Sequence, residues 1–161
     1  MIAVDTSALT SLASVDLAET VLAEFDVHTT RTVVRELEAS ADYDDVHGDA
    51  ARIVLDHGDE ITIHDTEPEL QTSRIDEGEG SVAALAEERG ADFLVTDDLR
   101  ALPELQNLVQ SKVAISPIVL RALVKRGALE DEVAEQKLET LAKRRDWLGA
   151  PIYRRAKELF S

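Results

Sequence analysis

The chain has 161 residues, of which 44% are hydrophobic and 4% aromatic, and its formal net charge at pH 7 is −16. This length suits one domain with a sizeable core of aliphatic side chains. The absence of cysteine excludes disulfides and thiolate metal sites, and no run of about eighteen apolar residues predicts a membrane span. Because the chain opens on a strand-like segment without a basic leader, we expect a cytoplasmic protein.

The charge balance is strongly acidic, with 33 acidic residues against 17 basic ones and arginine in excess of lysine. This composition resembles that of proteins from extreme halophiles, and we expect the source to be a halophilic archaeon; an ordinary acidic protein is the alternative. The charge argues against capture of nucleic acid by the whole surface. At molar salt, where the Debye length is only about 3 Å, local arginines and metal ions matter more than net charge.

Taken in chain order, short apolar runs alternate with helical spacing of apolar residues. Strands are expected at residues 2–5, 25–29, 61–64, 93–96 and 113–115. Helices are expected at about 8–12, 17–22, 30–41, 46–57, 81–90, from 116 onward, 129–145 and 152–160, with residues 65–75 as a loop. This alternation indicates an α/β domain of three layers, α/β/α, around a central parallel sheet of about five strands.

Asp5 directly follows the first strand and is itself followed by two hydroxyl residues, Thr6 and Ser7. Ligands of parallel sheets bind outside the carboxyl ends of the strands, which is where Asp5 is expected. The alternative is that Asp5 only caps the helix that follows it.

Three further acids are expected at the same edge. Asp97 follows another apolar strand, Glu36 interrupts an apolar helical face, and Glu79 lies at the start of the helix that precedes the Asp97 strand. Carboxylates that converge are unstable unless they bind cations or protons, and hard oxygen ligands select Mg²⁺ or Mn²⁺. Such a site can activate water and stabilise an in-line phosphodiester transition state. The alternative is chance proximity in an acidic chain.

Four segments in order resemble the motifs of the PIN-domain ribonucleases, a family that includes the VapC-like toxins. They are residues 4–9 (VDTSAL), 33–37 (VVREL), 78–86 (GEGSVAALA) and 94–98 (LVTDD). The match covers about residues 1–120, and the C-terminal helices resemble a subgroup whose third acid is the Glu of Gly-Glu. In the VapC-type branch this acid is usually Asp, so the reach of Glu79 differs by one methylene.

The resemblance implies a single PIN-like domain over residues 1–161, with a core of about 1–120 and C-terminal helices at about 117–161. It implies metal-dependent cleavage of single-stranded RNA that leaves a 3′-hydroxyl and a 5′-phosphate. The implied metal-binding and catalytic residues are Asp5, Glu36, Glu79 and Asp97, with Thr6, Ser7 and Thr96 orienting metal, water or a carboxylate.

Several assignments remain open in the sequence. Asp98 adjoins Asp97 as a further candidate ligand, and we favour Asp97 because it is nearer the strand end. Arg100 is expected either to bind a scissile phosphate or to pair with a neighbouring carboxylate. Asp76 and Glu77 are expected to be solvated. The four histidines show no metal-ligand spacing and are expected at the surface or at strand ends: His28, His47, His57 and His64.

Two functional hypotheses follow. The first is a Mg²⁺- or Mn²⁺-dependent endoribonuclease, with a toxin held inactive by a small antitoxin protein as one biological setting. The second is a PIN-like module that binds RNA or protein with little nuclease activity. Self-association as a homodimer is also expected, whereas a membrane partner is not.

Overall fold

The structure is a computed structural model that describes residues 1–66, 75–145, 147 and 151–158. The chain divides into two compact units, Met1–Ile115 and Ser116–Ser161. No helix in the described part of the chain is both long enough and apolar enough to cross a bilayer.

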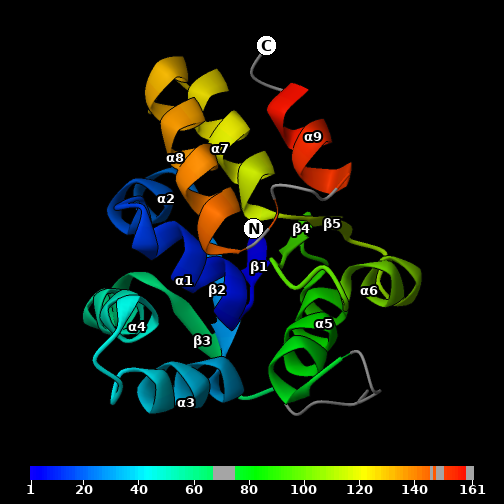
Figure 1. Cartoon of the computed structure of the whole chain (residues 1–161). Coiled ribbons are helices and arrows are strands. Elements are labelled where there is room, and N and C mark those ends of the chain that lie inside the picture. The colour runs from blue at the N-terminus through cyan, green and yellow to red at the C-terminus, as the bar shows by residue number, and fades with distance from the viewer. Residues whose placement is uncertain (67–74, 146, 148–150, 159–161) are drawn as a thin grey trace. The chain divides into compact units, whose positions relative to one another are not determined.

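The first unit contains one five-stranded sheet in the order β3-β2-β1-β4-β5 (Figure 1). All four strand pairs are parallel, which confirms the predicted parallel sheet. The strands are β1 (Ile2–Val4), β2 (Val27–Thr30), β3 (Thr62–His64), β4 (Phe93–Val95) and β5 (Lys112–Ala114). β1 lies at the centre with all three residues buried, as expected for a short apolar run covered on both faces.

Helices complete the three predicted layers. α5 packs on β1, β2 and β4, while α1 packs against α4 and α3 packs against both α4 and α5. The helices and the single 3-10 turn η1 of this unit are α1 (Thr6–Ser14), α2 (Ala18–Glu24), α3 (Arg31–Ser40), α4 (Val46–Asp56), η1 (Gly58–Glu60), α5 (Glu77–Arg89) and α6 (Leu102–Leu108).

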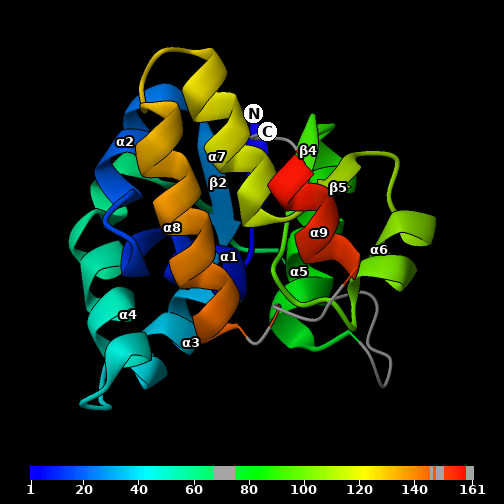
Figure 2. The ribbon, with the colours of Figure 1, turned by 45° about the horizontal axis from the view of Figure 1, so that its top comes forward.

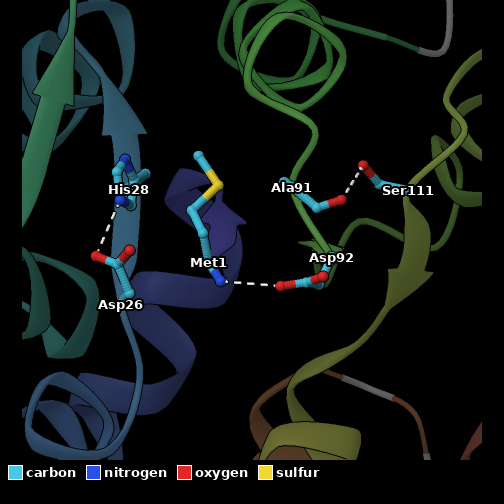
Figure 3. Close-up of polar contacts among 6 residues, drawn as sticks. All are labelled: Met1, Asp26, His28, Ala91, Asp92 and Ser111. Carbon is cyan, nitrogen blue, oxygen red and sulfur yellow. Dashed lines mark hydrogen bonds and ion pairs between the residues drawn. The ribbon is translucent and has the colours of Figure 1, made fainter.

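The start of the first unit is tied to its neighbours at the amino edge of the sheet (Figure 3). The Met1 amino group pairs with Asp92 at 3.0 Å, and the Ser111 hydroxyl donates to the Ala91 carbonyl at 2.7 Å. These contacts join the beginnings of β1, β4 and β5.

The second unit consists of α7 (Ser116–Lys125), α8 (Asp131–Arg144) and α9 (Pro151–Glu158). α7 and α8 lie side by side in both views (Figure 2). Their leucines Leu120, Leu123, Leu138 and Leu141 are buried at helical spacing, which is the pattern that predicted these helices.

Some boundaries differ from the prediction. α5 begins at Glu77 rather than at 81, because Asp76 caps the helix and draws the Gly-Glu segment into its first turn. α6 was not predicted, since its seven residues show little periodicity. Of the loop expected at 65–75, residues 67–74 lie outside the described part.

Three side-chain caps start helices at the carboxyl edge of the sheet. Asp5 caps α1, Thr30 caps α3 and Asp76 caps α5. In each, a side-chain oxygen accepts from a backbone N–H of the first turn, which would otherwise lack a partner. Asp5 and Thr30 thus connect the ends of β1 and β2 directly to the first turns of α1 and α3.

Candidate functional site

Asp5 lies at the centre of the carboxyl edge and is only 2% exposed. Its Oδ1 accepts from the Ala8 N–H at 3.0 Å and from the Ser7 hydroxyl at 2.7 Å. Its Oδ2 accepts from the Thr96 hydroxyl at 2.5 Å. Asp5 therefore does cap α1, and its second oxygen is directed to Thr96, the residue after β4.

The electrostatics of Asp5 are unusual for an aspartate. Burial is the largest effect and raises its pKa to about 7, although the hydrogen bonds from Thr96, Ala8 and Ser7 lower it. The nearby charge of Asp97 raises it further. A carboxyl group held this way binds a proton near neutral pH unless a cation replaces the proton.

Asp97 lies two residues after the end of β4 and is 3% exposed. Its backbone N–H donates to the Ser7 hydroxyl at 2.9 Å, and that hydroxyl also lies 3.4 Å from the Thr96 hydroxyl. Ser7 and Thr96 thus connect the ends of β1 and β4. Both hydroxyls also donate to the Asp5 carboxylate.

Glu36 reaches the same region from α3. The Thr6 hydroxyl donates to its Oε1 at 2.5 Å. Burial, the largest effect, raises the pKa of Glu36; the Thr6 bond lowers it, and the charges of Asp76 and Glu77 raise it. Those two acids are exposed, as expected.

Gly78 makes room for Glu36. A Cβ at position 78 would overlap both the oxygens and the carboxyl carbon of Glu36. The Glu36 carboxylate therefore lies directly against the first turn of α5, where the positive end of the helix dipole favours an anion. The sequence signal was present in the Gly-Glu motif, but only its Glu was assigned a role.

Glu79 has two sets of partners. It completes a capping box, since its Oε2 accepts from the Asp76 N–H at 3.1 Å while its own N–H donates to Asp76 Oδ1 at 2.9 Å. Its carboxyl group also hydrogen-bonds Asp98. Burial, followed by this bond, raises the pKa of Glu79 to about 9.

Asp98 is the ionised member of that pair. Burial opposes its ionisation, but the bonds from Glu79 and from the N–H groups of Arg100 and Ala101 outweigh burial and lower the pKa of Asp98, with the Arg100 charge helping. The two N–H groups donate to Asp98 Oδ1 at 3.0 and 3.4 Å. One proton shared by Glu79 and Asp98, and held by Glu79, accounts for both shifts.

The structure thus groups the predicted acids into three sets along one edge. Asp5 lies with Asp97, Glu79 lies with Asp98, and Glu36 lies against Gly78. Among the described residues, no three His, Asp or Glu side chains are already arranged around one point as ion ligands. Arg100 is an exposed residue whose backbone N–H donates to Asp98, and its phosphate-binding role stays a prediction.

The donor set fits a hard divalent cation. Every candidate ligand is a carboxylate, which suits Mg²⁺ or Mn²⁺. Burial is the largest cause of the raised pKa values of Asp5, Glu36 and Glu79, so the charged forms of these groups are disfavoured in the protein alone. A bound cation would stabilise the charged forms.

Comparison with known families adds the deciding observation. A family model for the PIN domain matches residues 1–161 of the chain. The chain belongs to the PIN-domain family. PIN domains are generally nucleases that use divalent metals, which agrees with an edge lined by carboxylates. No curated protein and no solved structure gives a significant match to this PIN domain.

Proposed function

We propose that this PIN domain is a Mg²⁺- or Mn²⁺-dependent endoribonuclease that cleaves phosphodiesters of single-stranded RNA. The observation that carries the proposal is the buried Asp5 carboxylate, placed beside Asp97 at the carboxyl edge and oriented by the Ser7 and Thr96 hydroxyls. A buried acid held at a pKa of about 7 is costly as a capping residue alone. The proposed role explains why the chain retains it.

The proposed ligands are Asp5, Glu36, Glu79 and Asp97, with Asp98 as a further ligand. A bound divalent ion supplies a hydroxide at neutral pH and neutralises charge on the phosphate. Thr96 and Ser7 hold the Asp5 carboxylate in one orientation, and Thr6 does the same for Glu36. The proton between Glu79 and Asp98 must leave before both carboxylates bind a cation.

Arg100 is the proposed contact to the substrate phosphate. Arg100 is exposed and follows Asp98 by two residues, and its backbone N–H donates to Asp98, so its side chain starts beside the acids. Such a contact positions RNA without reading its sequence, and it becomes important because the chain as a whole carries a charge of −16.

The test is cleavage of a mixed single-stranded RNA by EDTA-stripped protein with Mn²⁺, Mg²⁺ or no metal, at low and at molar salt. Asp5→Asn is the key variant and Asp59→Asn, in η1, is its matched control. Metal-dependent cutting that Asp5→Asn abolishes and Asp59→Asn retains supports the proposal. Failure of the folded wild type to cut in every metal and salt condition overturns it.

The second candidate is an RNA- or protein-binding module with little nuclease activity. It is favoured by the arrangement of the acids in separate sets rather than around one point, as far as the described residues show. Retention of labelled RNA without cleavage by metal-loaded protein would support it. Cleavage of the bound RNA distinguishes the enzyme from the binding module.

The proposed biological setting is the toxin of a toxin–antitoxin pair, with a small antitoxin covering the acidic edge. Co-expression with the product of a short adjacent reading frame tests it, because a cognate antitoxin should co-purify and suppress cleavage. The expected homodimer is tested by sedimentation. The acidic composition and the proposed halophilic archaeal source predict that the protein remains folded at molar salt.

A further inference from the structure

Two histidines of neighbouring strands meet on one face of the sheet. His28 lies within β2, and His64 ends the edge strand β3. In the parallel register Thr62 pairs with His28 and His64 with Thr30, so the two histidines are diagonal neighbours on the same face. Nδ1 of His28 and Nε2 of His64 are 2.8 Å apart.

The contact with Asp26 indicates which tautomer His28 adopts. Nε2 of His28 lies 2.9 Å from Oδ1 of Asp26 (Figure 3). Because an ionised carboxylate only accepts hydrogen bonds, this nitrogen carries the proton and Nδ1 presents its lone pair to His64. Metal-binding histidines are commonly held in this way, with a carboxylate on the nitrogen that does not touch the ion.

The His64 ring can present a lone pair at the same place. With this tautomer of His28, Nε2–H of His64 is the donor of the hydrogen bond between the two rings. If that proton moves to Nδ1 of His64, both facing nitrogens are unprotonated and no proton is released overall. Burial, with the Arg89 and His28 charges, lowers the pKa of His64, which keeps the ring neutral; Glu88 acts in the opposite direction.

We propose that His28 and His64 form a binding site for a divalent ion that prefers imidazole, namely Ni²⁺, Cu²⁺ or Zn²⁺, with Asp26 as a positioning residue. Two nitrogens each about 2.0–2.1 Å from an ion, at a right angle, are about 2.9 Å apart, and a right angle suits tetragonal Ni²⁺ and Cu²⁺. The observed 2.8 Å is already at that spacing.

Binding requires the two rings to turn, because they are nearly coplanar, at 17°, with centroids 5.1 Å apart, and their facing nitrogens point at each other. β3 is the edge strand and both rings are only partly buried, so the ion can enter from solvent. No third His or acid completes the ligand set within the described residues. Water fills the remaining positions.

This site differs in chemistry from the carboxylate edge. Imidazole favours late transition metals, whereas carboxylates favour Mg²⁺ and Mn²⁺. An ion bound here would tie β3 to β2, and β2 ends at Thr30, the cap of the helix that carries Glu36. Since the unfolded chain does not hold the two rings together, binding stabilises the native state.

The experiment is a calorimetric titration of untagged, EDTA-stripped full chain with Ni²⁺ in excess Mg²⁺, which occupies the carboxylates. Thermal unfolding with and without Ni²⁺ accompanies it. The variants are His28→Gln, His64→Gln and Asp26→Asn. His57→Gln is the matched control, because His57 also lies 2.8 Å from a carboxylate, that of Glu60, but has no histidine neighbour in the described structure.

We expect one Ni²⁺ per chain, a rise in melting temperature, and loss of both in His28→Gln and His64→Gln, with no change in His57→Gln. Asp26→Asn should weaken binding by about 10- to 100-fold. Binding of Cu²⁺ should give an electron paramagnetic resonance spectrum with two coupled nitrogens. The proposal is overturned if the folded wild type does not bind Ni²⁺, or if His28→Gln and His64→Gln both bind Ni²⁺ as tightly as the wild type. All these readouts are independent of nuclease activity.

Discussion

Gly78 of α5 lies against the carboxylate of Glu36 in α3, with no room for even a methyl group between them. The contact joins two of the four segments that resemble PIN-domain motifs, residues 33–37 and 78–86. It also places a negative charge at the first turn of α5, beside the exposed acids Asp76 and Glu77. The position of Glu36 thus depends on the absence of a side chain in another helix.

The first prediction is that Gly78→Ala displaces Glu36 and lowers RNA cleavage about 100-fold, as a shift of roughly 1 Å at a reacting centre does. Gly58→Ala is the matched control, since a Cβ there meets nothing within 4 Å. Circular dichroism and single-turnover cleavage are the measurements.

The same contact offers a rescue test. In the double variant Gly78→Ala/Glu36→Asp, the shorter carboxylate makes space for the added methyl. We expect it to cleave faster than Gly78→Ala alone, although Glu36→Asp by itself is slower than wild type. Additive losses in the double variant would show that the two residues act independently.

The second prediction concerns stability and pH. Because the folded-state pKa of Asp5 is raised to about 7, the folded metal-free protein binds a proton that the unfolded chain releases near pH 4. The stability contributed by this group is therefore complete below about pH 4 and is lost as the pH rises through about 7. Asp5→Asn should stabilise the metal-free protein at pH 8, by up to about 4 kcal/mol, while abolishing cleavage.

Urea unfolding in EDTA at pH 4 and pH 8 measures this effect. At pH 4 the wild type and Asp5→Asn should be equally stable, which makes the low-pH comparison an internal control. A variant that is less stable than wild type at pH 8 would show that the ionised carboxylate contributes favourably to the fold.

The third prediction is proton release on metal binding. With pKa values of about 7 for Asp5 and about 9 for Glu79, both groups are protonated at pH 6 and only Glu79 at pH 8. Binding of Mn²⁺ should release about two protons at pH 6 and about one at pH 8. Calorimetry in buffers of different ionisation enthalpy gives these numbers. Glu79→Gln should remove the release at pH 8, and equal release at both pH values would contradict the assignment.

The fourth prediction concerns Thr96, whose hydroxyl donates to Asp5 in the buried part of the site. Thr96→Val leaves Asp5 Oδ2 without this donor and should cost about 1–3 kcal/mol at pH 8 in the metal-free protein. The pKa of Asp5 should rise further, so the acidic limb of the pH–rate profile should move to higher pH. Thr96→Ser keeps the hydroxyl and should leave the profile in place.

The fifth prediction concerns Arg100. Arg100→Ala should raise KM for RNA several-fold with little change in kcat, because a phosphate contact present in both ground and transition states changes binding uniformly. Arg126→Ala, just after α7, is the matched control, because Arg126 is exposed like Arg100. An equal loss of kcat would place Arg100 at the reacting phosphate instead.

Apart from α6, the sequence by itself determined the order of the main helices and strands and the residues at the strand ends. A fully buried parallel strand is a continuous apolar run, and a helix repeats its apolar residues every three or four positions, so both are local signals. Asp5 and Asp97 could be placed at one edge on that basis, because all strands of a parallel sheet end there. Their hydroxyl neighbours Thr6, Ser7 and Thr96 followed from adjacency in the chain.

Only the tertiary structure decided which side chains meet. The pairing of Glu79 with Asp98, the contact of Glu36 with Gly78 and the His28–His64 pair each join elements far apart in the chain. Strand register and helix packing set these distances, and neither is encoded in local spacing. The histidines show this most clearly, since their separation of 36 positions has no metal-ligand pattern until β2 and β3 pair in parallel.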